Sequence, residues 1–293
     1  MVINRKVIVV VLVVIMSVAA LFIASSMRHR TSAVRAGSSR TTPQEAMAEA
    51  VSNESPVSNV KNLTTGRGLT AVTRAAETNK YIFAYFYRVE DEQTRMMKGV
   101  FSAAISNVAG KADSVTINIT EPSEKGIVDK FGLGRAPMPL AMVVAPNGAI
   151  TGAFPRKFEE KQLTEAIVSP CTEKCLKALQ ERKLVFLCVQ NDKTKQNDAA
   201  MRGVMNFKAD ARFAQATEII TVDPAVEAEV EFLEKLKINP ASDEALTVFL
   251  APPGRVIGTY NGATDKAQLA KMLLAVMSNC GSGCGPSGCG PKK

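Results

Sequence analysis

Apolar positions along the chain follow two different periods, and segments of the two kinds alternate from residue 69 to residue 277. Short, almost continuous apolar runs such as Tyr81–Tyr87 (YIFAYFY) are typical of buried strands. Between these runs, as in Glu92–Asn107, apolar residues recur every three or four positions, which is typical of helices packed on one side. Strands that alternate with helices predict an α/β protein.

The same order of elements occurs twice, which predicts a tandem repeat. In the first copy we expect helices at 69–79, 92–107, 122–131 and 159–168, and strands at 81–87, 114–119, 140–145 and 149–153. In the second copy we expect helices at 172–182, 198–209, 225–236 and 264–277, and strands at 184–189, 218–222, 246–251 and 255–260. Strands joined through helices pair in parallel, and the turns Pro146–Gly148 and Pro252–Gly254 predict antiparallel hairpins. We therefore expect two domains, 67–169 and 170–278, each a mixed sheet with helices on both faces.

Three segments carry a resemblance to a known family: Pro139–Gly148 (PLAMVVAPNG), Ala245–Gly254 (ALTVFLAPPG) and Arg255–Leu269 (RVIGTYNGATDKAQL). They resemble the strand, the hairpin and the final helix that follow the cis-proline of the thioredoxin-like superfamily. The resemblance covers both copies and implies two tandem thioredoxin-like domains. It also implies a cis peptide bond before Pro139, whereas Ala245 takes the corresponding place in the second copy.

Both copies lack the motif on which thioredoxin chemistry depends. Thioredoxin-like enzymes carry Cys-x-x-Cys between the first core strand and its helix, where the helix N-terminus lowers the pKa of the attacking thiol. The corresponding loops here, 88–94 and 190–195, contain no cysteine. The only histidine, His29, lies before both copies, which excludes a His-assisted nucleophile or a His-containing metal site in the folded body. The fold is therefore expected to act as a scaffold or binding surface.

Cys171 and Cys175 are the candidate catalytic residues, because they stand one turn apart at the start of a predicted helix. The positive end of that helix favours the thiolate form, which would suit a redox or metal-binding role. The alternative is that the two cysteines are a structural pair, or partly buried thiols, at a domain junction. Cys188 lies in a strand and is expected to be a buried core residue. Other side chains are expected to be structural: Met96, Met97, Met201 and Met205 in the core, and Glu159, Glu160, Glu227, Glu229 and Glu231 on solvated helix faces.

The tail at 279–293 is rich in glycine and holds the remaining cysteines, Cys280, Cys284 and Cys289. Its glycines allow these sulfurs to converge, so they are candidate ligands for Cu(I), or for Zn with Cys171 or Cys175 as a fourth ligand. A disulfide with a distant cysteine and a low-complexity end without a site remain the alternatives.

The N-terminal apolar run at 7–24 follows Arg5 and Lys6 and carries no charge. Its length favours an uncleaved membrane anchor over a cleaved signal peptide within 1–24, and the segment 25–66 is expected to be a tether. A basic start followed by an apolar run favours export, which places the body outside the cytoplasm, in a periplasmic space. The arginines that follow the run favour the opposite orientation.

The formal charge of +8 is located at the ends of the chain. Residues 1–43 hold six basic residues and no acid, and Lys292 and Lys293 close the tail, so the body between them is neutral. A neutral body without Trp argues against nucleic-acid binding. The sequence also lacks a phosphate-binding glycine motif after a strand, so we do not expect a nucleotide-binding site.

These patterns support two functions. The first is a membrane-tethered, non-enzymatic binding or scaffold protein that acts in thiol or metal homeostasis through a protein partner. The second is a thiol-disulfide oxidoreductase or soft-metal carrier that uses the tail cysteines together with Cys171 and Cys175.

Overall fold

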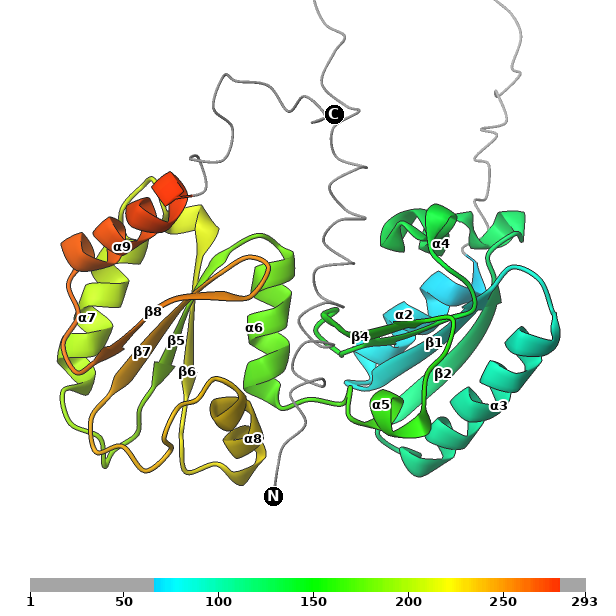
Figure 1. The fold of residues 1–293 in the computed structure, drawn as a ribbon, viewed down its shortest axis with the longest axis horizontal. Helices are drawn as coiled ribbons and strands as arrows, with labels where there is room; N and C mark the ends of the chain where they lie inside the picture. Colours follow the sequence, from blue (N-terminus) through cyan, green and yellow to red (C-terminus); the bar gives the residue numbers. More distant parts are fainter. Residues whose placement is uncertain (1–65, 280–293) are drawn as a thin grey trace, which may run out of the picture.

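The computed structural model describes residues 66–279 (Figure 1). The predicted membrane anchor, the tether and the cysteine-rich tail lie outside these residues. Within 66–279, no helix is both long enough and apolar enough to cross a membrane.

The described chain forms two successive sets of helices and strands, which we name domain 1 and domain 2. Domain 1 contains α2 (Arg67–Glu77), β1 (Tyr81–Tyr87), α3 (Glu92–Asn107), β2 (Ala112–Asn118), α4 (Lys125–Phe131), β3 (Leu140–Val144), β4 (Ile150–Pro155) and α5 (Glu160–Thr164), with short 3-10 turns at Pro122–Glu124 and Leu133–Arg135. Domain 2 contains α6 (Pro170–Gln180), β5 (Leu184–Val189), α7 (Asn197–Lys208), β6 (Thr217–Val222), α8 (Glu227–Lys235), β7 (Leu246–Ala251), β8 (Arg255–Asn261) and α9 (Lys266–Asn279), with a 3-10 turn at Ala214–Ala216.

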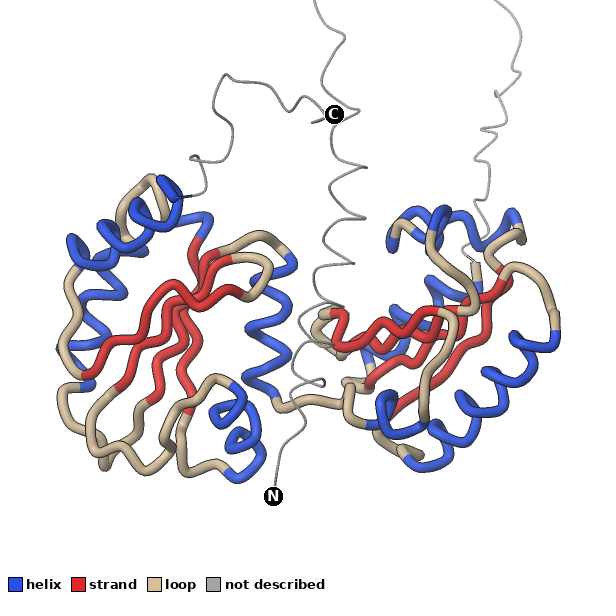
Figure 2. Tube along the Cα trace, viewed as in Figure 1, coloured by secondary structure: helices blue, strands red, loops and turns tan. Residues whose placement is uncertain are grey.

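Each domain is built on one mixed four-stranded sheet (Figure 2). The strand orders are β2-β1-β3-β4 and β6-β5-β7-β8. The first two strands of each domain pair in parallel, and the other neighbours pair antiparallel. The predicted architecture of two mixed sheets, each with helices on both faces, is therefore confirmed.

Both faces of each sheet are buried, which explains the nearly continuous apolar strands. In β1, Phe83 and Tyr85 join the core beneath α3 and α5, while Ile82 and Phe86 join the core beneath α2 and α4. Domain 2 repeats this division, with separate cores on the two faces of its sheet.

The repeat extends to single hydrogen bonds. After α2, the amide of Lys80 donates to Ala75 O at 2.8 Å, and after α6, Lys183 donates to Ala178 O at 2.9 Å. At the end of the hairpin, the amide of Arg156 donates to Pro139 O at 2.6 Å, and Gly262 donates to Ala245 O at 2.7 Å. Arg156 and Gly262 both have a φ of 66°. Ala245 therefore occupies the structural position of Pro139.

One predicted helix is wrong in extent. The helix expected at 159–168 is only α5, Glu160–Thr164. After Thr164, the amides of Ala166 and Ile167 bond carbonyls three residues back, so the backbone leaves α-helical geometry. The hydroxyl of Tyr81 then accepts from Val168 N at 3.1 Å and donates to Val168 O at 3.0 Å. Ser169 then caps a new helix that has Pro170 in its first turn.

That new helix, α6, contacts both domains. Cys171, Cys175 and Leu179 point into the core of domain 2. On the domain 1 side, Leu176 packs against the core that contains Tyr81. The side chain of Gln180 bonds both backbone groups of Ile150, accepting from N at 3.0 Å and donating to O at 2.7 Å. Consequently α6 lies between the two sheets and covers the outer edge of β4 (Figure 1).

Candidate functional site

The loop between β1 and α3 occupies the place where the thioredoxin motif would lie. Asp91 begins α3 and accepts a hydrogen bond from Thr94 N at 2.7 Å, which lowers the pKa of its carboxyl group. In the same loop, Arg88 donates to Gly134 O at 3.1 Å. The Asp91 cap orients α3 without any thiol at its start.

The loops around this position are bonded to one another. Gln93 Nε2 donates to Arg156 O at 3.1 Å, and Arg156 N donates to Pro139 O. The peptide bond between Met138 and Pro139 is cis. We call the surface formed by residues 88–93, 134–139 and 156–157, together with Met96, the loop face of domain 1.

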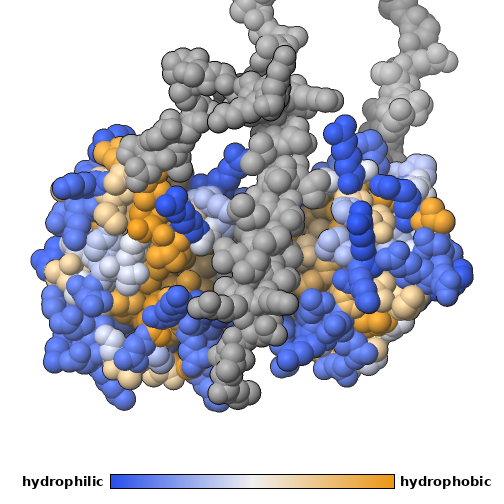
Figure 3. Space-filling view, viewed as in Figure 1, coloured by the Kyte–Doolittle hydropathy of each residue, from blue (hydrophilic) through white to orange (hydrophobic). Residues whose placement is uncertain are grey.

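The loop face exposes large apolar side chains. Val89 is 65% exposed and Met96 is 58% exposed, so the prediction that Met96 lies in the core is wrong. The same prediction for Met205 of domain 2 is also wrong, because that side chain is 58% exposed. The loop face also holds exposed basic residues, Arg88, Arg135, Arg156 and Lys157, and Arg95 of α3 is exposed as well. Most of the described surface shown in Figure 3 is hydrophilic. Val89 and Met96 are the exposed large apolar side chains of domain 1.

The matching loop of domain 2 is closed by its own chain. Thr194 Oγ1 accepts from Asn191 N at 2.9 Å and bonds Asn197 Oδ1 at 2.7 Å, and Asn197 Nδ2 donates to Asn191 O at 2.7 Å. Lys195 pairs with the segment before β7, donating to Asp243 O at 2.8 Å and accepting from Ala245 N at 2.9 Å. Asn191, Thr194 and Lys195 are thus bonded within their own chain, whereas Oε1 of Gln190 is buried without a hydrogen-bond partner among the described residues.

Cys171 and Cys175 lie at the start of α6, as predicted, but inside the core. They are 8% and 3% exposed, and both are free thiols. Burial and the neighbouring Glu229 raise the pKa of Cys171 to about 11, and burial and Cys171 raise that of Cys175 to about 12. The expected stabilisation of thiolate by the helix N-terminus is thus reversed, because desolvation disfavours the charged form more strongly. Their catalytic role remains a prediction.

Cys188 is a buried core residue, as expected, with burial raising its pKa to about 12. No group of three or more potential metal ligands occurs among residues 66–279. The candidate ligands Cys280, Cys284 and Cys289 lie outside the described residues.

Sequence reasoning missed a pair of buried glutamates. Glu229 is 4% exposed rather than solvated, so that prediction is wrong; its carboxylate accepts from Cys171 N at 3.0 Å and from Ser169 Oγ at 2.5 Å. In domain 1, Glu124 is 1% exposed and accepts from Gly68 N at 3.0 Å. Each glutamate satisfies orphan donors at the N-terminus of the first helix of its domain. The only clue in the sequence was their equivalent position in the two copies.

The fold of both domains is thioredoxin-like, as the strand order, the pairing directions and the final hairpin show. No protein-family model matches the chain, and no curated protein matches it either.

Similar solved structures include thioredoxin O2 from Arabidopsis thaliana, with 15% identity, a TM-score of 0.28, and coverage of 34% of this chain and 83% of that one. A disulphide isomerase from Xylella fastidiosa Temecula1 has 14% identity, a TM-score of 0.27, and coverage of 39% and 95%. The NTD_N/C domain of the alkylhydroperoxide reductase AhpF from Enterococcus faecalis has 15% identity, a TM-score of 0.25, and coverage of 70% and 98%. The assignment of the fold rests on the topology above.

Proposed function

We propose that this chain is a non-enzymatic binding protein that holds a partner protein on the loop face of domain 1. The observation that carries the proposal is the exposure of Val89 and Met96 at the place where a thioredoxin-like enzyme would carry its dithiol. Exposed apolar side chains grouped on one face are typical of protein interfaces.

The charges around these side chains indicate the kind of partner. Among the acidic residues of the loop, Glu90 forms an ion pair with Lys98 at 3.7 Å, Asp91 is held by the helix start, and Glu92 is exposed without an ion pair within residues 66–279. The exposed arginines of the loop face form no ion pairs within residues 66–279. A partner that places an apolar side chain over Val89 and acidic residues around it is complementary to this face.

The sequence supports a setting for this binding. The apolar run at 7–24 would tether the chain to a membrane, with the body outside the cytoplasm. A role in thiol or metal homeostasis rests on the cysteine-rich tail.

A site-specific photocrosslinker tests the proposal. We would place benzoylphenylalanine at Val89 of the full chain in its own cells, with Val226 of domain 2, which is 45% exposed, as the matched control position. We expect one defined protein adduct from position 89 and none from position 226. Introducing Met96→Asp beside the photocrosslinker should reduce the adduct about tenfold, because a charge then faces the apolar contact. An adduct that is unchanged by Met96→Asp, or that is identical from both positions, would contradict the proposal.

A thiol or metal activity of Cys280, Cys284 and Cys289, with Cys171 or Cys175, is the second candidate. The clustering of three cysteines within the last 14 residues supports it. We would titrate the full chain with Cu(I) and with Zn, and compare it with the variant carrying Cys→Ser at all three tail positions. Equal uptake by both proteins would remove the metal role, and absence of disulfide reductase activity in both would remove the redox role.

A further inference from the structure

The two outer strands of the domain 1 sheet differ in their cover. β4 is covered by α6, whose Gln180 bonds the backbone of Ile150. β2 pairs only with β1, so its other side is an open edge within the described chain. An open strand edge presents backbone donors and acceptors that can pair with another strand.

The phase of the β1–β2 ladder shows which groups face that edge. Tyr81 N donates to Lys111 O at 3.2 Å, and Ile119 N donates to Tyr87 O at 2.9 Å. Because alternate residues of a parallel strand bond the same neighbour, Ser114 and Thr116 direct their backbone groups away from β1. Neither residue has a backbone hydrogen bond to any other described residue.

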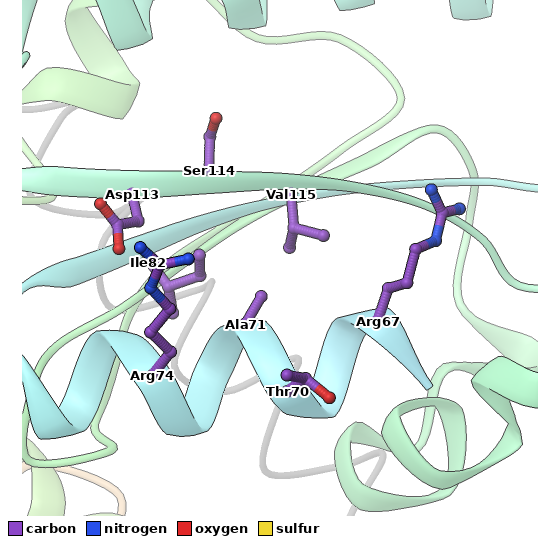
Figure 4. Close-up of a pocket in the computed structure, with 8 residues that line it drawn as sticks. All are labelled: Arg67, Thr70, Ala71, Arg74, Ile82, Asp113, Ser114 and Val115. Atoms are coloured by element: carbon purple, nitrogen blue, oxygen red, sulfur yellow. The ribbon is translucent and has the colours of Figure 1, made fainter. Parts of the chain in front are cut away.

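A groove of about 500 Å³ runs beside this edge, between β2 and α2 (Figure 4). It is lined by Arg67, Thr70, Ala71, Arg74, Ile82, Asp113, Ser114 and Val115. In Figure 4, Arg67 and Arg74 extend from α2 toward the level of β2, at the two ends of the groove.

Two arginines and one acid line the groove, and the acids in and beside it are already paired with basic side chains. Arg67 is 72% exposed, and its ion pairs with Glu121 and Glu124 are both 3.8 Å long. Arg74 forms no ion pair within residues 66–279. Asp113, the one acid of the lining, is paired with Lys80 at 3.2 Å. Acidic side chains are therefore the complement of this groove.

Domain 2 lacks this arrangement at the equivalent place. The positions of Arg67 and Arg74 are occupied there by Pro170 and by Lys177, which is paired with Glu181 at 3.3 Å. The outward face of α6 is also the face that contacts domain 1. The basic groove beside an open edge is thus specific to domain 1.

We propose that the open edge of β2 binds an extended, acidic segment of a partner protein as a fifth strand. The backbone of the segment pairs with Ser114 and Thr116, and its carboxylates contact Arg67 and Arg74. Strand addition takes its affinity from main-chain hydrogen bonds and its specificity from alternate side chains, which this groove provides. A second copy of this chain fits less well, because pairing two β2 strands brings the arginines of both copies together.

The test uses the full chain and the fluorescent hexapeptide acetyl-Glu-Val-Thr-Val-Glu-Val-amide, with binding measured by fluorescence anisotropy at low salt. The double variant Arg67→Glu/Arg74→Glu should weaken binding at least about tenfold, while Arg202→Glu, an exposed arginine of α7, should leave it unchanged. A lysine-for-glutamate peptide should bind the unmodified protein at least about tenfold more weakly.

Peptide chemistry separates strand pairing from simple charge attraction without altering the protein. Methylating the alternate peptide nitrogens that would bond β2 should abolish binding. Methylating the other set, which would point away from β2, should leave binding intact. Hydrogen exchange at Ser114 and Thr116 should slow when the peptide is bound. Equal binding of the two methylated peptides would overturn the proposal. If these two amides are protected without peptide at every protein concentration, the edge is covered by this chain itself. If their protection rises with protein concentration, the edge pairs with a second copy. Either result would overturn the proposal.

Discussion

The two domains share one topology but complete their cores differently. The last helix of domain 2, α9, has 14 residues and supplies Leu269 and Leu273 to its own core. The last helix of domain 1, α5, has only 5 residues, and Leu176 of α6 packs on the corresponding core. One core of domain 1 is therefore covered in part by a helix that belongs to the next repeat, and we expect domain 1 to depend on that helix for stability.

The domains also differ in chemistry. The three described thiols, Cys171, Cys175 and Cys188, are all buried in domain 2, whereas domain 1 contains no cysteine. The accessible loop face and the open basic edge, in contrast, are both in domain 1. Thus the domain that carries the loop face has no thiol, and the domain with thiols holds them away from solvent.

The largest expected effect is a pH dependence that separates the domains. Burial raises the pKa values of Cys171, Cys175 and Cys188 to about 11, about 12 and about 12. Thiols of the unfolded chain titrate near pH 8.5, so above that pH the unfolded state binds fewer protons than the folded state. The stability of domain 2 is therefore fully present below about pH 8.5 and decreases as the pH rises. We expect domain 2 to lose about 4 kcal/mol at about pH 9.5.

Urea unfolding read by pulsed hydrogen exchange on peptides of each domain would measure this loss. In domain 1, burial raises the pKa values of Tyr81 and Tyr85, but unfolded tyrosines titrate only near pH 10. The unfolding midpoint of domain 1 should therefore fall less than that of domain 2. An equal fall of the two unfolding midpoints would show that the buried thiols do not make domain 2 more sensitive to pH than domain 1.

The next effect concerns the buried glutamates. Glu229→Ala leaves Cys171 N and Ser169 Oγ without their buried acceptor, so we expect a loss of about 3 kcal/mol in urea denaturation. Glu124→Ala should cost less, because one of its carboxylate oxygens has no hydrogen-bond partner in the described structure. Glu231→Ala on the exposed side of α8 is the control and should change stability by less than about 0.5 kcal/mol. A loss at Glu231 as large as that at Glu229 would contradict the capping role.

A smaller effect tests the shared helix directly. Leu176→Ala should lower the stability of domain 1 by about 1.5 kcal/mol, because the half-buried side chain packs on that core. The matched variant Leu179→Ala, whose side chain packs in a core of domain 2, should instead destabilise that domain. Hydrogen exchange of β1 and β5 distinguishes the two responses. If Leu176→Ala weakened only β5, domain 1 would be independent of α6.

The smallest effect is at the covered edge. Gln180→Ala removes two hydrogen bonds to Ile150, and we expect about 1 kcal/mol less protection of the Ile150 amide against exchange. Glu77→Ala, at the equivalent position on α2, should leave the amides of domain 1 unchanged, apart from fraying of the helix end. Unchanged protection at Ile150 in the Gln180 variant would mean that α6 covers the edge without these bonds.

Local patterns were sufficient to predict the architecture from the sequence. Alternating apolar periods identified every strand, and the turns Pro146–Gly148 and Pro252–Gly254 identified the hairpins. These features depend on residues close together in the chain. The expected start of β2 at Ser114 was two residues late, because Ala112 and Asp113 extend the strand with little apolar signal.

What could not be predicted depends on residues far apart in the chain. Glu229 looks solvated in its helix and becomes a cap only because α8 packs beside α6. Cys171 stands at a helix start that would favour thiolate in water, and only the core around it reverses that preference. After α5, the amide of Val168 bonds a tyrosine hydroxyl 87 residues earlier in the chain.

The position of α6 has a consequence for synthesis. The chain leaves the ribosome N-terminus first, so all strands of domain 1 emerge before Leu176 and Gln180. Until α6 follows, one core of domain 1 lacks part of its cover and the backbone of Ile150 has no partner for the Gln180 bonds. A released chain that ends at residue 169 should therefore expose both, and a chain extended by the 11 residues of α6 should close them.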